Sequence, residues 1–138
     1  PTGYAGPRRR VLVVDDVADN RQMLVELLGP LGFEIDQAAD GPRALAAIAR
    51  QAPDLVLLDM AMPGLSGPQI LQQIRAQAGL AKLPVMALSA HASNADRAEC
   101  LAAGANTFMT KPVDVPALLA QVAELLALTW LQPKSAAG

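Results

Sequence analysis

The sequence has little of three things that would point to a particular environment: cysteine, long apolar runs and excess charge. Cys100 is the only cysteine among the 138 residues, so the chain cannot form an internal disulfide. No apolar run approaches the roughly 20 residues that a membrane span needs, and no signal peptide is recognisable. We therefore expect a cytoplasmic domain in which Cys100 is a reduced packing residue, whether or not a parent protein is membrane-anchored.

The balance of charges does not favour a polyanionic partner. The 11 basic and 13 acidic residues leave a net charge of −2. This value argues against direct binding to nucleic acid and against insertion into a membrane. The only basic run, Arg8 to Arg10, is best explained as a solvated lead-in to a strand. Since 52% of the residues are apolar, the chain can build the core of one domain.

Strand-like and helix-like segments alternate along the chain. Val11 to Val14 and Leu55 to Leu58 are fully apolar, which is typical of strands buried on both faces of a sheet. Five strand–helix units predict an α/β fold, a parallel sheet with helices on both faces. The predicted strands are 10–15, 33–37, 54–59, 83–88 and 106–109, and the predicted helices are 20–28, 42–50, 68–76, 94–103 and 116–128.

The ends of the chain differ in composition from its middle. Residues 1–7 are rich in Gly and Pro and are interpreted as a linker, and residues 131–138 as a polar C-terminal tail. One domain is therefore predicted over residues 8–130. Capping residues mark the predicted helix starts: Asp19 with Gln22, Ser66 with Gln69, Asp40, and Asp114.

Polar residues follow the predicted strands at the sheet edge where ligands bind in such folds. Asp15 and Asp16 end the first strand and Asp59 ends the third. Two unit charges ~4 Å apart repel by about 4 kcal/mol at an effective dielectric of ~20. The fold must therefore bind a cation or raise a pKa at this place. Oxygen ligands with this much negative charge suit Mg²⁺, with Mn²⁺ as the alternative.

Two further side chains complete a phosphoryl-transfer site. Lys111 supplies a compact positive charge for a phosphoryl oxygen, and Ser89 supplies a hydroxyl that can hydrogen-bond the same group. Asp59 would then be the nucleophile and would form an acyl phosphate. A single aspartate after a strand is often only a helix cap, and the functional interpretation depends on the joint placement of these residues at strand ends.

These segments resemble the response-regulator receiver domain of two-component systems over about 8–128. The resemblance implies a flavodoxin-like doubly wound (βα)5 fold with strand order 2-1-3-4-5. It also implies a domain that is not an enzyme in its own right, because it catalyses only its own phosphorylation and slow dephosphorylation. The matching stretches are Val11-Leu12-Val13-Val14-Asp15-Asp16, Asp59-Met60-Ala61-Met62-Pro63-Gly64-Leu65-Ser66-Gly67, Leu88-Ser89-Ala90 and Thr110-Lys111-Pro112.

Roles follow from the resemblance residue by residue. The phosphoryl group comes from a phosphohistidine on a histidine kinase or a histidine phosphotransfer protein. The cofactor is Mg²⁺. The implied roles are phosphoacceptor for Asp59, metal ligation for Asp15, Asp16 (the more direct ligand), Asp59 and the backbone carbonyl of Ala61, switch hydroxyl for Ser89, and a lysine joined by a cis bond to Pro112 for Lys111.

Two positions differ from the common pattern of the family. Phe108 stands at the aromatic switch position, which is often Tyr. Without a hydroxyl, its inward rotamer needs no hydrogen-bond partner, so we hypothesise that the unphosphorylated domain samples that rotamer more readily. His91 lies two residues after Ser89. Two interpretations stay open for it: an exposed loop histidine, or a modulator of dephosphorylation that contacts the attacking water.

Phosphorylation should change the surface of the helix at 94–103, the strand at 106–109 and the helix at 116–128. This surface could bind neighbouring domains or a second copy, or the last helix could be an ordinary alanine-rich one. The chain begins with Pro1, not Met, and carries no effector domain, so we expect a receiver from a hybrid histidine kinase or phosphorelay protein. The alternative is a stand-alone single-domain response regulator.

Three other classes fit less well. A phosphohydrolase with an aspartyl nucleophile typically has a second Asp two residues later, where this sequence has Ala61. A pseudo-receiver would usually have lost an acidic residue or the lysine. A flavin-binding protein of similar topology would need a phosphate-binding loop where Asp15 and Asp16 stand, and their charges would repel the phosphate.

Overall fold

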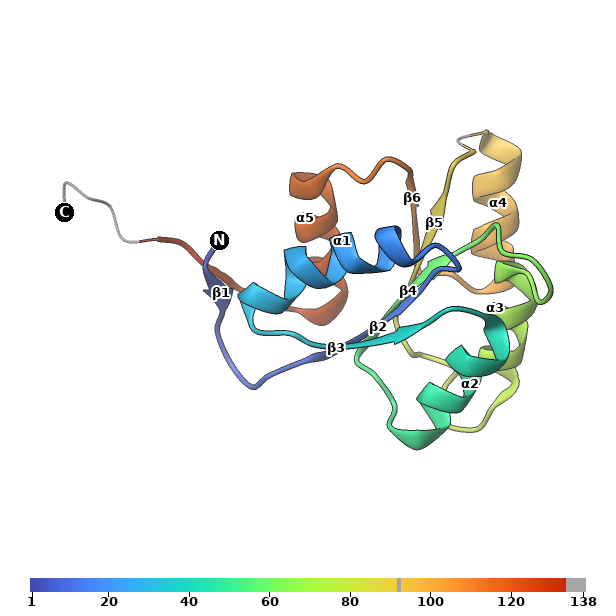
Figure 1. Cartoon of the computed structure of the whole chain (residues 1–138), viewed down its shortest axis with the longest axis horizontal. Helices are drawn as coiled ribbons and strands as arrows, with labels where there is room; N and C mark the ends of the chain where they lie inside the picture. The colour runs from blue at the N-terminus through green and yellow to red at the C-terminus, as the bar shows by residue number, and fades with distance from the viewer. Residues whose placement is uncertain (92, 134–138) are drawn as a thin grey trace.

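A computed structural model describes residues 1–91 and 93–133, and its centre is one parallel sheet (Figure 1). The strand order β3-β2-β4-β5-β6 confirms the expected doubly wound topology, in which the second strand of the repeat lies at one edge. The strands are β2 (Arg10–Val14), β3 (Glu34–Ala38), β4 (Leu55–Asp59), β5 (Val85–Ser89) and β6 (Thr107–Thr110).

Helices cover both faces of the sheet. In Figure 1, α1 and α5 lie on one side of the strands, and α2, α3 and α4 on the other. None of the helices in the described part of the chain is both long and apolar enough to cross a membrane. The bounds are α1 (Ala18–Leu28), the short 3-10 helix η1 (Gly29–Leu31), α2 (Gly41–Arg50), α3 (Gly67–Ala76), α4 (Asn94–Ala103) and α5 (Val115–Leu126).

The central strands hold the two layers together. Leu57 packs in the cluster beneath α1 and α5, whereas its neighbour Leu58 packs in the cluster beneath α2, α3 and α4. Both side chains are fully buried, and burying a Leu contributes roughly 1.5–3 kcal/mol. Strands that are apolar on both faces are therefore fixed in place, and their carboxyl ends meet at one edge. Cys100 is buried on α4, as predicted.

Two of the four predicted helix caps form in the structure, and two do not. Ser66 and Gln69 form a reciprocal capping box, and Asp40 accepts the amide of Arg43. The predicted capping by Asp19 and Gln22 is wrong, because α1 begins two residues earlier than predicted, after Val17. Asp19 lies instead in the first turn, where its charge suits the helix dipole. Asp114 is at the N-cap of α5, but its side chain makes no capping hydrogen bond.

Several element ends also differ from the prediction. α5 ends at Leu126, not at 128, because Ala127 takes a left-handed conformation with φ 52°. β5 begins at Val85, after Pro84, and includes Ser89 at its end. Proline has no amide to donate to the ladder, which explains the later start.

Gly3 and Tyr4, which the sequence placed in a linker, form a short strand. β1 (Gly3–Tyr4) pairs antiparallel with β7 (Trp130–Leu131), so residues from both ends of the described chain lie side by side. Tyr4 packs its ring on Phe33, with 4.6 Å between the centroids. This pairing depends on contacts between distant residues, which a local Gly/Pro pattern does not reveal. Residues 134–138 of the predicted tail lie outside the described residues.

Gly67 permits the close packing of α3 against the loop after β4. A Cβ at this position would lie 2.6 Å from Cα of Met60 and 2.5 Å from its sulfur. Because backbone would have to move, we predict that Gly67→Ala lowers the free energy of unfolding by about 1–3 kcal/mol, measured by urea denaturation.

Gly29→Ala is the matched control for this substitution. Gly29 has helical angles (φ −55°, ψ −50°), and a Cβ there would meet nothing within 4 Å. This variant should be neutral or stabilising, by up to about 1 kcal/mol. Equal unfolding midpoints for Gly67→Ala and the wild type would contradict the packing argument.

Candidate functional site

Three carboxylates meet at the carboxyl ends of β2 and β4. One oxygen from each of Asp15, Asp16 and Asp59 lies within 4.8 Å of the others. Asp15 and Asp59 are 2% and 4% exposed, whereas Asp16 is exposed to solvent. Fully apolar strands carry the two buried carboxylates into this position, and water cannot screen their repulsion there as it does at a surface.

Lys111, after β6, is the positive partner of the buried pair. Its Nζ lies 2.9 Å from Asp15 Oδ2 and 3.4 Å from Asp59 Oδ1. Its backbone amide donates to the carbonyl of Ser89, at 2.7 Å, and the bond from Lys111 to Pro112 is cis. The site thus has one nearby ammonium group for two buried carboxylates and an exposed third.

Burial raises the pKa of Asp59 above its ordinary value. The charge of Asp15 raises it further, while the amide of Ala61 and the charge of Lys111 oppose the rise without cancelling it. Burial alone would lower the pKa of Lys111, but its hydrogen bond to Asp15 and the charge of Asp59 outweigh this effect and raise it. Lys111 therefore keeps its proton, and Asp59 holds its negative charge at a cost.

The protein already engages both carboxylate oxygens of Asp15. Oδ1 accepts the amide of Val17 at 2.9 Å, and Oδ2 accepts from Lys111. The Asp16 carboxylate accepts no hydrogen bond from residues 1–91 or 93–133. Asp16 is thus the carboxylate with most freedom to bind an ion.

The donor set fits a hard divalent cation. It consists of three carboxylate oxygens at mutual distances that one small ion can bridge. The acidic cluster could therefore hold a metal ion. Asp15, Asp16 and Asp59 are the side chains that could hold it.

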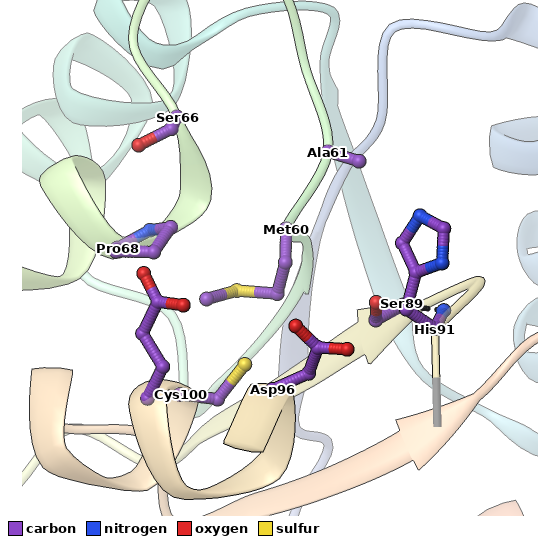
Figure 2. Close-up of a pocket in the computed structure, with 9 residues that line it drawn as sticks. Met60, Ala61, Ser66, Pro68, Ser89, His91, Asp96 and Cys100 are labelled. Atoms are coloured by element: carbon purple, nitrogen blue, oxygen red, sulfur yellow. Dashed lines mark hydrogen bonds between the residues drawn. The ribbon is translucent and has the colours of Figure 1, made fainter. Parts of the chain in front are cut away.

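Ser89 reaches the site from the neighbouring strand. Its side chain is buried, and its hydroxyl accepts the amide of His91 at 3.1 Å, the contact drawn as a dashed line in Figure 2. A cavity of about 220 Å³ opens beside it, between α4 and the loop after β4. Met60, Asp96 and Cys100 also line this cavity (Figure 2). His91 is exposed, and its side chain lines the rim of the cavity.

Phe108 is buried against the same layer as Cys100. The residue is 3% exposed, and it packs in the cluster beneath α2, α3 and α4. The guanidinium carbon of Arg97, on α4, lies 5.2 Å from the ring centroid. A cation over an aromatic face contributes about 0.5–1 kcal/mol at an exposed position. Arg97 thus covers the buried ring, and no local sequence pattern predicts this contact.

A larger groove of about 420 Å³ runs along the other side of the site. It lies between α1 and the segment before α5, and Asp15 and Lys111 form part of its wall. Met23, also in its lining, is 47% exposed. Val17, just before α1, is 46% exposed, and Val115, the first residue of α5, is 42% exposed. Apolar side chains thus make up most of the groove wall beside Asp15 and Lys111.

The structure brings together the residues that the sequence singled out. Asp15, Asp16, Asp59 and Lys111 form one charged cluster. Ser89 and Phe108 face the α4 side of the sheet. No motif in the sequence pointed to Arg21, whose guanidinium donates to the Asp15 carbonyl at 2.7 Å and holds the turn after β2.

Comparison with known proteins gives one consistent family. The profile of the response regulator receiver domain matches residues 11–123. The response regulator PleD of Caulobacter vibrioides is 37% identical over 94% of this chain and 29% of its own length. The sensor histidine kinase RcsC of Salmonella typhi is 41% identical over 78% of this chain and 11% of its own. The chain thus spans less than a third of either relative.

Solved structures show the same fold. The chemotaxis protein CheY4 of Vibrio cholerae superposes with a TM-score of 0.82 and 31% identity, covering 87% of this chain and all of that one (100%). The receiver domain of a signal transduction histidine kinase from Syntrophus aciditrophicus gives 0.79 and 27%, covering 86% and 90%.

The raised pKa of Asp59 predicts how stability depends on pH. A carboxyl whose folded pKa is raised contributes stability below its unfolded pKa, and that contribution is lost as pH rises through the folded pKa. Asp59→Asn should therefore raise the melting temperature at pH 7 without divalent ions, where each 1 kcal/mol of added stability corresponds to roughly 3–5 °C in a domain of this size. The gain should disappear below about pH 4.

Asp36→Asn is the control, because Asp36 is paired with Arg10 at 2.8 Å and lies outside the cluster. It should not stabilise the domain. Mg²⁺ at ten times its dissociation constant should add about 1.4 kcal/mol to the wild type and less to Asp59→Asn. A melting temperature for Asp59→Asn below that of the wild type at pH 7 would contradict the account.

Proposed function

Because the chain belongs to the response regulator receiver domain family, we propose that Asp59 accepts a phosphoryl group within a two-component phosphorelay. The observation that carries this proposal is the buried Asp59 carboxylate beside Lys111, 3.4 Å away, with a raised pKa. Adding a phosphoryl group converts this strained carboxylate into an acyl phosphate. Its new charge lies on phosphoryl oxygens, which extend toward Lys111 and the exposed Asp16 side.

The geometry indicates which oxygen attacks. Asp59 Oδ1 accepts the Ala61 amide at 3.1 Å and faces Lys111, whereas Oδ2 accepts no hydrogen bond within the described part of the chain. We infer that Oδ2 forms the new bond to phosphorus while the P–N bond of the phosphohistidine breaks. The electron pair of that bond returns to the imidazole nitrogen of the donor. In dephosphorylation, water attacks phosphorus, the P–O bond to Asp59 breaks, and inorganic phosphate leaves the regenerated carboxylate.

Neighbouring groups neutralise and orient the phosphoryl oxygens. Lys111 is fixed by Asp15 and can turn one N–H toward the new group. Ser89 can donate its hydroxyl proton, which no hydrogen bond to described residues uses. Mg²⁺, held by Asp16, Asp59 and the carbonyl of Ala61, would supply further charge neutralisation. Mn²⁺ has the same ligand preferences.

We propose that the switch works through Ser89 and Phe108. These side chains face the same layer, so movement of the Ser89 hydroxyl toward the phosphoryl group changes the packing around Phe108. Thr107 donates to Gln121 on α5 at 2.6 Å, which links the same strand to the next helix. The surface of α4, β6 and α5 would then change and bind a neighbouring domain or a second copy.

The donor is proposed to be a histidine kinase or a histidine phosphotransfer protein. Met23, which lines the groove next to Asp15 and Lys111, has an exposed apolar side chain that could pack against such a partner, as do Val17 and Val115 at the starts of α1 and α5. Similarity to RcsC supports a hybrid kinase as the parent protein, and similarity to PleD supports a response regulator. A stand-alone, cytoplasmic regulator is the alternative. A phosphohydrolase stays disfavoured by Ala61.

Incubation with acetyl phosphate and Mg²⁺ tests the phosphoacceptor directly. Intact mass should rise by one phosphoryl group, and Asp59→Asn should show no gain. Asp36→Asn should gain mass like the wild type. Asp36 is paired with Leu12, three residues before Asp15, and so lies away from the carboxyl end of the sheet where the cluster is. No gain for the wild type with any phosphodonor, or an equal gain for Asp59→Asn, would overturn the assignment.

The decay of that mass gain tests His91. If the side chain contacts the attacking water, His91→Ala should change the phosphoryl lifetime. An unaltered lifetime would favour the exposed loop histidine.

The environment of Phe108 predicts the effect of a hydroxyl at that position. Phe108→Tyr places an O–H among buried apolar atoms beneath Arg97, where leaving it without a partner costs about 1–3 kcal/mol. The outward rotamer should therefore become more populated in the unphosphorylated domain, as measured by aromatic ¹³C NMR. Identical rotamer populations in the variant and wild type would refute the hypothesis.

A further inference from the structure

The two ends of the described chain form a small structure of their own, which we call the terminal clasp (residues 2–5 and 129–131). Its backbone ladder includes the amides of Thr2 and Ala5, which donate to the carbonyls of Leu131 and Thr129 at 2.8 and 3.0 Å. Figure 1 shows β1 beside the last described segment, at the opposite end of the molecule from α4. All of these residues lie outside 11–123, the part that matches the family profile.

Aromatic packing fixes the clasp to the domain. The chain has one Trp, one Tyr and two Phe, and three of these four residues, Tyr4, Phe33 and Trp130, meet here. The Tyr4 hydroxyl donates to the Gly32 carbonyl at 3.1 Å and accepts the Arg9 amide at 2.8 Å. A free tail would make none of these contacts, so the clasp belongs to the folded unit.

Trp130 attaches the clasp to the middle of α5. Its indole N–H donates to the backbone carbonyl of Leu119 at 3.1 Å. Leu119 is itself buried with Met109 of β6 in the cluster that the Trp130 ring covers. The position of the indole therefore depends on where α5 lies against β6.

α5 also connects the clasp to the candidate site. It begins four residues after Lys111, which holds Asp15 and Asp59, and ends four residues before Trp130. With 12 residues at 1.5 Å per residue, it is a rod of about 18 Å. Thr107 and Gln121 join this rod to β6 by a side-chain hydrogen bond of 2.6 Å. A shift of β6 or Lys111 would therefore be expected to displace the Leu119 carbonyl.

We propose that the terminal clasp is an output element, closed while Asp59 is unmodified and opened when Asp59 carries a phosphoryl group. This proposal rests on the proposed function of Asp59. In the unmodified domain, the closed clasp makes its contacts with α5 and β6 through the Trp130 ring. Rearrangement of these elements therefore weakens the Trp130–Leu119 hydrogen bond and the ring contacts that depend on it. Opening would release residues 2–5 and 129–131 from each other. Any segment joined to either of them would then be free to change its position.

The single tryptophan makes the proposal measurable in the whole chain. The wild type is treated with acetyl phosphate and Mg²⁺, and intact mass and Trp130 fluorescence are recorded on the same sample. Mass gain should be accompanied by a red shift of emission and stronger quenching by acrylamide. Asp59→Asn should show neither change. A full mass gain with unchanged emission overturns the clasp proposal alone, whereas absence of the mass gain overturns the phosphoacceptor assignment.

Reciprocity supplies an independent test. If phosphorylation opens the clasp, then loosening the clasp must favour the phosphorylated form of the site. Tyr4→Ala should therefore bind beryllofluoride, a non-covalent mimic of the phosphoryl group, about 5-fold or more tightly in the presence of Mg²⁺. Thr2→Ala is the matched control, because it removes only an exposed hydroxyl contact of 3.4 Å. Equal affinity of Tyr4→Ala and the wild type, with both folded by circular dichroism, contradicts the coupling.

Discussion

The whole site depends on two buried carboxylates that share one lysine. Asp15 and Asp59 lose their water because apolar strands carry them to the sheet edge, and Lys111 compensates only part of the charge. Burial therefore raises the pKa of Asp59, in spite of the lysine and the Ala61 amide. Such a cluster could hold a divalent cation, and in the proposed function it would gain from moving charge onto a phosphoryl group. In the proposed function, the electrostatic cost of the unmodified state is what favours phosphorylation of Asp59.

The packed core holds the charged side chains of the site in fixed positions. Strands that are buried on both faces are close-packed and leave Asp15, Asp59 and Ser89 little freedom to move. Gly67 lets the loop after β4 approach α3 closely, which keeps Ala61 in place to donate to Asp59. The membership in the receiver family follows from the profile match and from relatives of similar fold. The chemistry at Asp59 is the proposed consequence.

Sequence reasoning reached the sheet and the charged cluster for a physical reason. Apolar runs announce buried strands, and the carboxyl ends of parallel strands meet at one edge, so residues such as Asp59 and Lys111 could be brought together before any coordinates existed. It failed where distant residues decide the structure. The Phe108 ring is covered by Arg97 of α4, and the clasp depends on a Tyr4 side chain that packs beside Trp130. Neither contact follows from a local sequence pattern.

The central claim is that Asp59 is held ionised against an unfavourable environment. The most direct measurement is a pH titration of its side-chain carboxyl by ¹³C NMR in labelled protein, assigned by comparison with Asp59→Asn. Without divalent ions, the pKa of Asp59 should lie above its ordinary value of 3.8, and it should fall when Mg²⁺ is added. A pKa at or below the ordinary value in metal-free protein, unchanged by Mg²⁺, would contradict the account.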